Sequence, residues 1–459
     1  MAALAASLAG AADSPDARRR AAVRSRACAA RALSASLHFS SPPERSGAPL
    51  PFPSHVLRMN PMRLRRCHAL LIEPREVREL DLEALLMGQP RLRSTRRWIA
   101  LAAHIDDEIE LSAEQLAALG DISSEDAVEH AALAERFGAA LIDSLVAQRL
   151  LLAADESTEA DAPLRADAAV RSGHWRGLAA VMHRHLRWRG VNSEEARTSG
   201  ALGNSDQEIL ERLGTPPEVS RARASAEAAQ PLPAPAANVL PNSPLRATCR
   251  NFDASLRLPL EALATVLHRV YGAQGRSVVS GVPVLKKNSP SAGGLHPVEA
   301  YLLVRHVEGL ATGLYHYRPD THALEPLQPL SDEEAARCAS LFVAHQPWFV
   351  DAHVQVILAA RFRRNYWKYR NHAKAYRAVI LDSGHLSQMQ YLVATELGLG
   401  AFITAAVNEG DIEDAFGLDP MQEGVIAVTG FGWRGERMEV LEFDPLKQVW
   451  PAWTAEPQG

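Results

Sequence analysis

The sequence predicts an α+β protein, in which a sheet with packed helices is preceded by a small helical, winged-helix-like part. After residue 246, short apolar runs typical of buried strands alternate with longer stretches of helical periodicity. A segment rich in proline and alanine, residues 215–245, precedes this region and is typical of an extended linker. The chain of 459 residues also exceeds what one core usually supports, so we expect more than one domain.

The first segment, residues 1–58, is rich in alanine, arginine, serine and proline. Such a composition favours disorder, and an arginine-rich leader poor in acidic residues is also typical of a transit peptide. A third interpretation, preferred here, is that Met59 is the true start and residues 1–58 are a misassigned extension.

Residues 59–157 are expected to form a winged-helix-like accessory domain, with helices around 98–101 and 141–146 and a strand at 150–152. A helical accessory domain of unknown use is the alternative. Residues 158–245 are interpreted as one amphipathic helix followed by the linker. Four apolar residues at helical spacing predict the buried face of that helix: Trp175, Leu178, Met182 and Leu186.

Residues 246–455 carry the predicted sheet domain. Its helices are expected at 260–270, ending at Gly272, and at 376–397, ending at Gly398. Its strands are expected at 298–304, 313–317, 323–327, 354–360 and 425–429, the second and third forming a hairpin.

Composition excludes several classes of protein. With 49 Lys and Arg residues against 54 Asp and Glu residues, the net charge of −5 gives no general attraction to nucleic acid or to an anionic membrane. No apolar run is as long as a membrane span. The 4 cysteines never form a CxxC pair, which predicts neither a zinc cage nor a disulfide framework. We therefore expect a cytoplasmic protein with no metal, nucleic-acid or membrane partner.

Two motifs after the linker indicate a ligand. Arg246, Thr248 and Arg250 place two guanidinium groups and a hydroxyl at alternate positions, a pattern suited to phosphate, although it is also common on solvated surfaces. The stretch Ser289–Pro297 holds two adjacent glycines preceded by two serine hydroxyls, which indicates that a bound molecule comes close to the backbone. The alternative is a tight loop that joins a helix to a strand.

These motifs, taken in order with Lys368-Tyr369 and with Tyr376-Arg377-x4-Asp382-x-Gly384-His385, resemble the SagB-type dehydrogenases. These enzymes are the FMN-dependent branch of the nitroreductase superfamily, and they mature ribosomally made peptides. The resemblance covers roughly residues 246–437, and it implies a nitroreductase-like, FMN-binding sheet domain.

The resemblance also implies roles for single residues. The FMN-binding positions would be Arg246, Thr248, Arg250, Ser289, Ser291, Ala292, Gly293, Gly294, Leu295 and Arg434. Lys368 and Tyr369 would handle protons above the flavin, whereas composition alone favours a basic surface loop there. For Arg434 the alternative is a surface hairpin. The sequence Gly430–Gly435 spells GxGxxG, but residues 436–443 have a strand-like pattern rather than the helix that a dinucleotide fold requires.

The implied function is oxidation of a residue in a precursor peptide, of the azoline-to-azole type, by a cytoplasmic homodimer that works with other peptide-modifying enzymes. Two alternatives remain open. One is an NAD(P)H-dependent nitroreductase or flavin reductase, and the other is a non-catalytic scaffold that binds a peptide.

Overall fold

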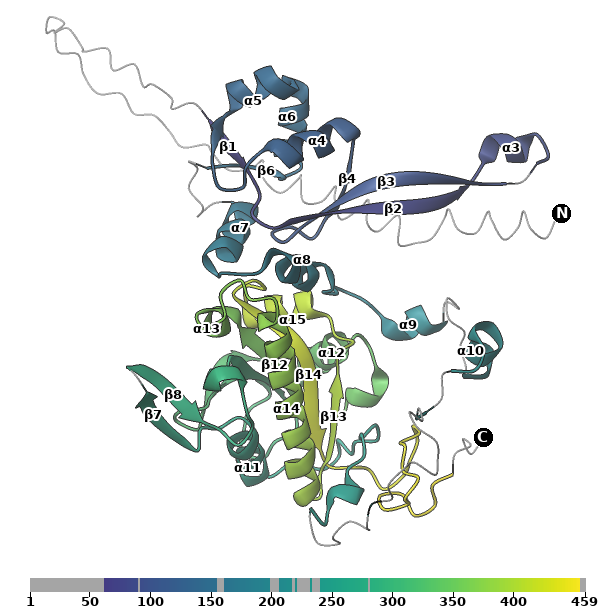
Figure 1. Cartoon of the computed structure of the whole chain (residues 1–459). Helices are drawn as coiled ribbons and strands as arrows, with labels where there is room; N and C mark the ends of the chain where they lie inside the picture. The colour runs from purple at the N-terminus through teal and green to yellow at the C-terminus, as the bar shows by residue number, and fades with distance from the viewer. Residues whose placement is uncertain are drawn as a thin grey trace, which may run out of the picture. The chain divides into compact units, whose positions relative to one another are not determined.

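The computed structural model describes residues 62–89, 91–154, 161–198, 206–216, 219–220, 232, 240–279 and 281–454 (Figure 1). The predicted extension at 1–58, Met59 and most of the predicted linker at 215–245 lie outside the described residues. Pro61–Gly459 forms one compact unit.

A six-stranded antiparallel sheet is the centre of the C-terminal part, with the strand order β11-β10-β9-β12-β14-β13. The two central strands are buried almost throughout, as their apolar runs predicted. The strands are β9 (Val298–Val304), β10 (Gly313–Arg318), β11 (Ala323–Pro329), β12 (Val354–Arg361), β13 (Gly400–Thr404) and β14 (Glu423–Gly432). The predicted α+β architecture is thus confirmed.

Helices pack on this sheet, and the long predicted helix is present as α14 (Ala375–Glu396), with Gly398 at φ +73° just beyond its end (Figure 1). The other helices of this part are α11 (Leu260–Val270), α12 (Asp332–Phe342), α13 (Phe362–Tyr366) and α15 (Glu409–Phe416). None of the helices in the described ranges is long and apolar enough to cross a membrane.

A hairpin that the sequence did not predict, β7 (Gly275–Val279) with β8 (Val282–Lys286), follows α11 and leads into the glycine-rich stretch.

The N-terminal part contains helices and two three-stranded sheets, ordered β5-β1-β6 and β2-β3-β4. The strands are β1 (Arg63–Arg66), β2 (Leu70–Leu80), β3 (Leu92–Ala102), β4 (Glu108–Leu111), β5 (Val128–Glu129) and β6 (Leu151–Ala153). The helices are α3 (Leu82–Leu86), α4 (Ala113–Asp121), α5 (His130–Phe137), α6 (Ala139–Ala147), α7 (Ala162–Ser172), α8 (Gly177–His185), α9 (Ser193–Thr198) and α10 (Asp206–Leu213).

The helix predicted at 98–101 is wrong, because these residues belong to β3. β3 pairs with β2 along its whole length of 11 residues and also with β4. A short apolar run fits a helix and a strand equally well, so the presence of neighbouring strands determines that these residues form a strand. The predictions at 141–146 and 150–152 are confirmed by α6 and β6.

The face predicted to be buried on α8 is also wrong. Leu178, Met182 and Leu186 are 63%, 42% and 64% exposed, whereas Ala180, Val181 and His183 are buried. The face with Ala180, Val181 and His183 packs on the C-terminal part, where His183 has two hydrogen-bond partners. Trp175, just before the helix, is buried as predicted.

The GxGxxG sequence has a packing explanation. A Cβ atom on Gly430 would collide with the ring of Phe402 and lie 2.8 Å from the carbonyl oxygen of Val354, and one on Gly432 would collide with the ring of His353. Residues 436–443 do not form the predicted strand, since β14 ends at Gly432. Backbone N–H groups of Glu439 and Val440 instead donate to the Asn251 side chain, both at 2.8 Å.

We expect Gly430→Ala to lower the free energy of unfolding by about 1–3 kcal/mol, because the added methyl overpacks a rigid strand core. The matched control is Gly120→Ala on α4, where nothing lies within 4 Å of the added atom and the helix gains propensity. Thermal unfolding followed by circular dichroism should show a lower midpoint for Gly430→Ala only. Equal midpoints for the two variants would contradict the packing explanation.

Candidate functional site

The glycine-rich stretch forms a tight turn, η3 (Ala292–Gly294), between β8 and β9. Gly293 and Gly294 have φ values of +61° and +68°, which L side chains rarely adopt. Both glycines are therefore required by the backbone. Gly294 is also open, because nothing in the described chain lies within 4 Å of a Cβ atom added there.

The middle of α14 fastens this turn. Asp382 is buried and accepts hydrogen bonds from the Ser291 hydroxyl at 2.5 Å and from the Ala292 N–H at 3.3 Å. The Ser291 oxygen in turn accepts the N–H of His296 at 2.9 Å. Burial raises the pKa of Asp382, and the two hydrogen bonds oppose that shift. The hydroxyl of Ser291 thus stabilises the turn through these two hydrogen bonds.

Two polar groups next to the turn are buried. The hydroxyl oxygen of Ser289 is buried and lacks a hydrogen-bond partner among the described atoms. Lys287 is 4% exposed, and burial lowers the pKa of its ammonium group, whereas the nearby Glu299 and Asp382 raise it. Buried polar groups are normally satisfied, so Ser289 faces a position suited to a ligand or a water molecule.

Lys368 and Tyr369 lie directly against the turn. A Cβ atom on Gly293 would come within 2.8 Å of the Tyr369 hydroxyl oxygen and 3.0 Å of the Lys368 Nζ. The ammonium nitrogen of Lys368 is 5.8 Å from the centre of the Tyr369 ring. The structure therefore brings together two predicted sets of residues that are separated by more than seventy positions in the sequence.

The predicted phosphate-binding residues divide into two groups. The Thr248 hydroxyl lies 3.0 Å from that of Tyr391, and the guanidinium carbon of Arg246 is 5.4 Å from the centre of the Tyr391 ring. Arg250 instead lines a cavity of about 510 Å³, together with Trp348 and Arg437. Arg246 and Thr248 are thus assembled at the C-terminal end of α14, whereas Arg250 faces another recess.

Arg434 is held inside the chain. Its guanidinium group forms an ion pair with the fully buried carboxylate of Glu442 and donates to the Ala247 carbonyl at 3.4 Å. Glu442 also accepts the Arg250 N–H at 2.6 Å and the Trp450 indole N–H at 2.9 Å. The surface-hairpin alternative for Arg434 is wrong, since its side chain is only 16% exposed.

Sequence reasoning missed several of these residues. Asp382 was part of the quoted motif but had no assigned role, and its burial was indicated only by its place after the apolar residues 378–381. Tyr391, Lys287 and Glu442 gave no local signal, because each acts on a partner far away in the sequence.

Comparisons with known proteins support the sheet domain as the functional part. The family model described as "Nitroreductase family" matches residues 245–433. The Methanocaldococcus jannaschii protein MJ1384, named as a nitroreductase, is 31% identical over 157 residues, which are 34% of this chain and 73% of that protein.

Two further relatives are named for peptide processing. The trifolitoxin-processing protein TfxB of Rhizobium leguminosarum is 31% identical over 31% of this chain and 38% of its own length. The microcin B17-processing protein McbC of Escherichia coli is 27% identical over 32% of this chain and 54% of its own length. The chain thus spans about half or less of these two relatives. The solved Escherichia coli microcin synthetase McbBCD complex with truncated pro-MccB17 is similar over 54% of this chain and 90% of that chain, with 20% identity and a TM-score of 0.39.

Proposed function

We propose, since the chain belongs to the nitroreductase family, that it is an FMN-dependent dehydrogenase that removes two hydrogens from a modified residue of a precursor peptide. The observation that carries this proposal is the contact of Lys368 and Tyr369 with Gly293. An acid–base pair and an exposed glycine backbone meet where the resemblance implies that the flavin ring is bound. The processing roles in the names of TfxB and McbC support a peptide substrate.

The residues present fit FMN. Asp382, at the turn, and Tyr391, beside Arg246 and Thr248, are nine positions apart on α14, which corresponds to about 13 Å along the helix axis. FMN has its phosphate at one end and its ring at the other, and the two clusters have the matching chemistry. Arg246 and Thr248 would hold the phosphate end. Ser289, with the open backbone at Gly294, would hold the ring.

Oxidation of an azoline to an azole removes one proton and one hydride from a five-membered ring. Bound FMN supplies the acceptor for the hydride, and oxygen is the proposed final acceptor of the two electrons. Either Lys368 as a neutral amine or Tyr369 as a phenolate would take the proton, because the Lys368 nitrogen and the Tyr369 oxygen both lie against the turn on which the ring would rest.

A second candidate, an NAD(P)H-dependent nitroreductase, is favoured by the match to MJ1384, which covers 73% of that protein. The two candidates differ in electron flow. Rapid bleaching of the flavin absorbance by NADH or NADPH, followed by turnover of a nitroarene, would favour the reductase. Absence of bleaching, with oxidation of a peptide under air, would favour the dehydrogenase.

The precursor peptide is the proposed substrate partner, and other peptide-modifying enzymes are proposed partners through the resemblance alone.

We also propose a homodimer that joins along α14. The exposed side of this helix carries Ile380 and Leu381, 46% and 56% exposed, and Gly384, with nothing of the described chain within 4 Å of an added Cβ atom. Leu381→Glu should shift the mass in sedimentation velocity from dimer to monomer, because a buried charge opposes association. Arg337→Ala on α12 is the control, and a parent protein that sediments as a monomer with bound flavin would contradict the dimer.

We expect Arg246→Ala to weaken FMN binding at least about tenfold, because a charge-assisted hydrogen bond contributes on the order of 2 kcal/mol. Arg250→Ala should weaken it less, since Arg250 lines another recess. The exposed Arg337→Ala should leave it unchanged. Flavin fluorescence titration of the apoprotein measures all three. Full FMN affinity in Arg246→Ala would show that the phosphate is bound elsewhere.

We expect Lys368→Ala to retain FMN but to lose about a hundred- to ten-thousandfold in turnover, which is the usual contribution of a general acid–base group. Tyr369→Phe should lower turnover less than Lys368→Ala does if the phenol relays the proton, and by about as much if the phenol is the base. Arg370→Ala, next in the chain and exposed, is the control. Mass spectrometry of the peptide, followed as a loss of two hydrogens, gives the rate. A Lys368→Ala/Tyr369→Phe double variant with the parent rate would refute the role of the pair.

A further inference from the structure

The segment that connects α7 to α8, together with α8 itself, contacts the loop that carries Lys368 and Tyr369. We define residues 173–187 as the brace and residues 362–372 as the catalytic loop. We propose that the brace positions the catalytic loop, so that the N-terminal part of the chain is required for the chemistry itself. This inference rests on the proposed function of Lys368 and Tyr369.

Backbone groups of the brace hold the end of the catalytic loop. The N–H of Asn371 donates to the His174 carbonyl at 3.0 Å. The Asn371 carboxamide, with its nitrogen toward the brace, donates to the carbonyls of His174 at 3.2 Å and Trp175 at 2.8 Å. His174 and Asn371 both have positive φ values, +57° and +50°, a region in which histidine and asparagine are enriched among non-glycine residues. Two residues with left-handed backbone thus meet at one set of hydrogen bonds.

An aromatic cluster holds the beginning of the catalytic loop. The ring of Trp175 lies 4.5 Å from that of Phe362 and 4.8 Å from that of Tyr366, centre to centre. Its indole N–H donates to the carbonyl of Met421 at 3.0 Å, and the next residue along, Gln422, accepts the N–H of Phe362 at 3.0 Å. Trp175 is 1% exposed, so this contact is part of the core.

His183 fixes α8 beside this cluster. Burial lowers the pKa of its imidazole to about 3, so the ring is neutral near pH 7. One nitrogen is 2.9 Å from the carbonyl of Pro420, which can only accept, so that nitrogen carries the proton. The other nitrogen therefore accepts the hydroxyl of Tyr376 at 2.9 Å. Gly424 leaves the space for this ring, since a Cβ atom there would lie 2.6 Å from its Nε2.

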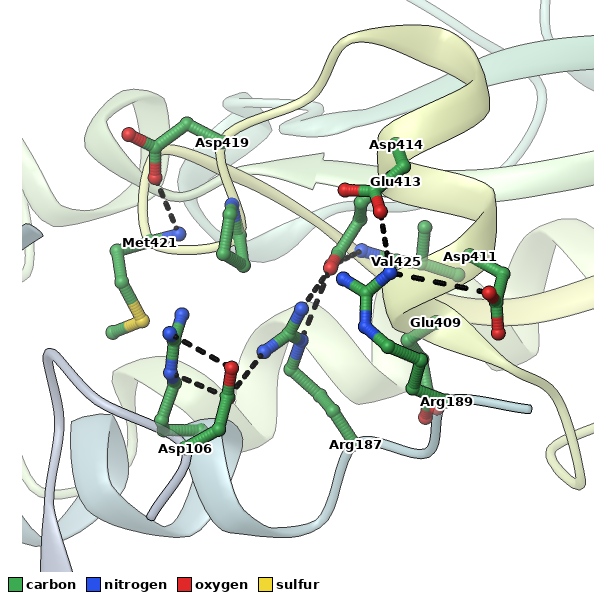
Figure 2. Close-up of polar contacts among 12 residues, drawn as sticks. Asp106, Arg187, Arg189, Glu409, Asp411, Glu413, Asp414, Asp419, Met421 and Val425 are labelled. Carbon is green, nitrogen blue, oxygen red and sulfur yellow. Dashed lines mark hydrogen bonds and ion pairs between the residues drawn. The ribbon is translucent and has the colours of Figure 1, made fainter. Parts of the chain in front are cut away.

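Ion pairs anchor the far end of the brace, as Figure 2 shows. Arg187 pairs with Glu413 on α15 and with Asp106, and Glu413 also accepts the N–H of Val425 on β14 at 3.2 Å. Arg187 and Glu413 are 8% and 2% exposed, so loss of Arg187 would leave the buried Glu413 carboxylate without its ion-pair partner. The pair fixes α8 against α15 and β14.

On its other side the brace contacts the N-terminal sheet. A Cβ atom on Gly177 would lie 3.7 Å from that of Ala69, and His185 is 3.1 Å from the Ala102 carbonyl. Ala69, Leu101 and Trp175 belong to the same buried core as Phe362. Any displacement of the N-terminal sheet would therefore be transmitted to the catalytic loop through close-packed contacts.

Asn371→Asp tests the brace with little change in size, because aspartate also tolerates a positive φ but cannot donate to the two carbonyls. We expect kcat to fall at least about tenfold with KM within about twofold and FMN retained, since the loop loses its position rather than its binding groups. Trp175→Phe, which keeps an aromatic ring, should retain more turnover than Trp175→Ala. Arg189→Ala, an exposed pair with Asp414 outside the brace, is the control with parent turnover.

Limited trypsin digestion of the flavin-free protein gives a readout that does not depend on activity. Lys368, Arg370 and Lys374 are exposed cleavage sites in or next to the catalytic loop. Cleavage there should accelerate at least about tenfold in Asn371→Asp, while cleavage at the exposed Arg437 should keep the parent rate.

The outcomes separate the two proposals. Faster cleavage at the loop together with a lower kcat supports the brace. Unchanged cleavage, or faster cleavage with the parent kcat, overturns it. Parent activity in the Lys368→Ala/Tyr369→Phe variant would overturn the proposed function instead, and the digestion would still report whether the brace holds the loop.

Discussion

The register of α14 against the central sheet is the constraint on which the candidate site depends. Gln390 sets it: this fully buried amide donates to the Thr429 hydroxyl at 2.7 Å and the Gly430 carbonyl at 3.1 Å, and it accepts the Tyr271 hydroxyl at 2.6 Å. A slip of the helix would leave these buried groups unpaired, at about 1–3 kcal/mol each. With Gln390 fixed, Asp382 reaches the glycine turn and Tyr391 reaches Thr248.

Charge is distributed unevenly around this helix. At the C-terminal end of α14, Arg434 is neutralised by Glu442, so its ion pair serves to fasten the segment after β14. Arg246 lies over an aromatic ring instead, where its charge remains available to an anion. An arginine that is paired with a buried glutamate and an exposed arginine that has no ion pair among the described residues differ in what they can bind.

The sheet and its helices could be predicted because their patterns are local. The apolar run of β9 and the periodicity of α14 are each contained in one segment, and Gly398 marks the end of the helix. The prediction of a helix at Trp98 was wrong because an apolar run fits a helix and a strand equally well, and pairing with β2 makes it a strand. The prediction of the buried face of α8 was wrong because the contacts of His183, and not the apolar spacing, determine which face is buried.

The candidate site was predictable only where a motif was contiguous. The glycine turn and the Lys368–Tyr369 pair could each be found, but their contact depends on the fold of seventy intervening residues. Tyr391, Glu442 and Trp175 each contact residues far away in the sequence, and such contacts leave no spacing pattern that could be recognised in the sequence.

The contact between Trp175 and Met421 joins residues that are 246 positions apart. Contacts with such sequence separation form late, because a long loop must close before they contribute to stability. At about 5–20 residues per second, a ribosome needs roughly 12–50 s to make the chain between them. Until then the Trp175 side chain has neither Phe362 nor Tyr366 to pack against, so it is an apolar surface of the nascent chain to which a chaperone can bind.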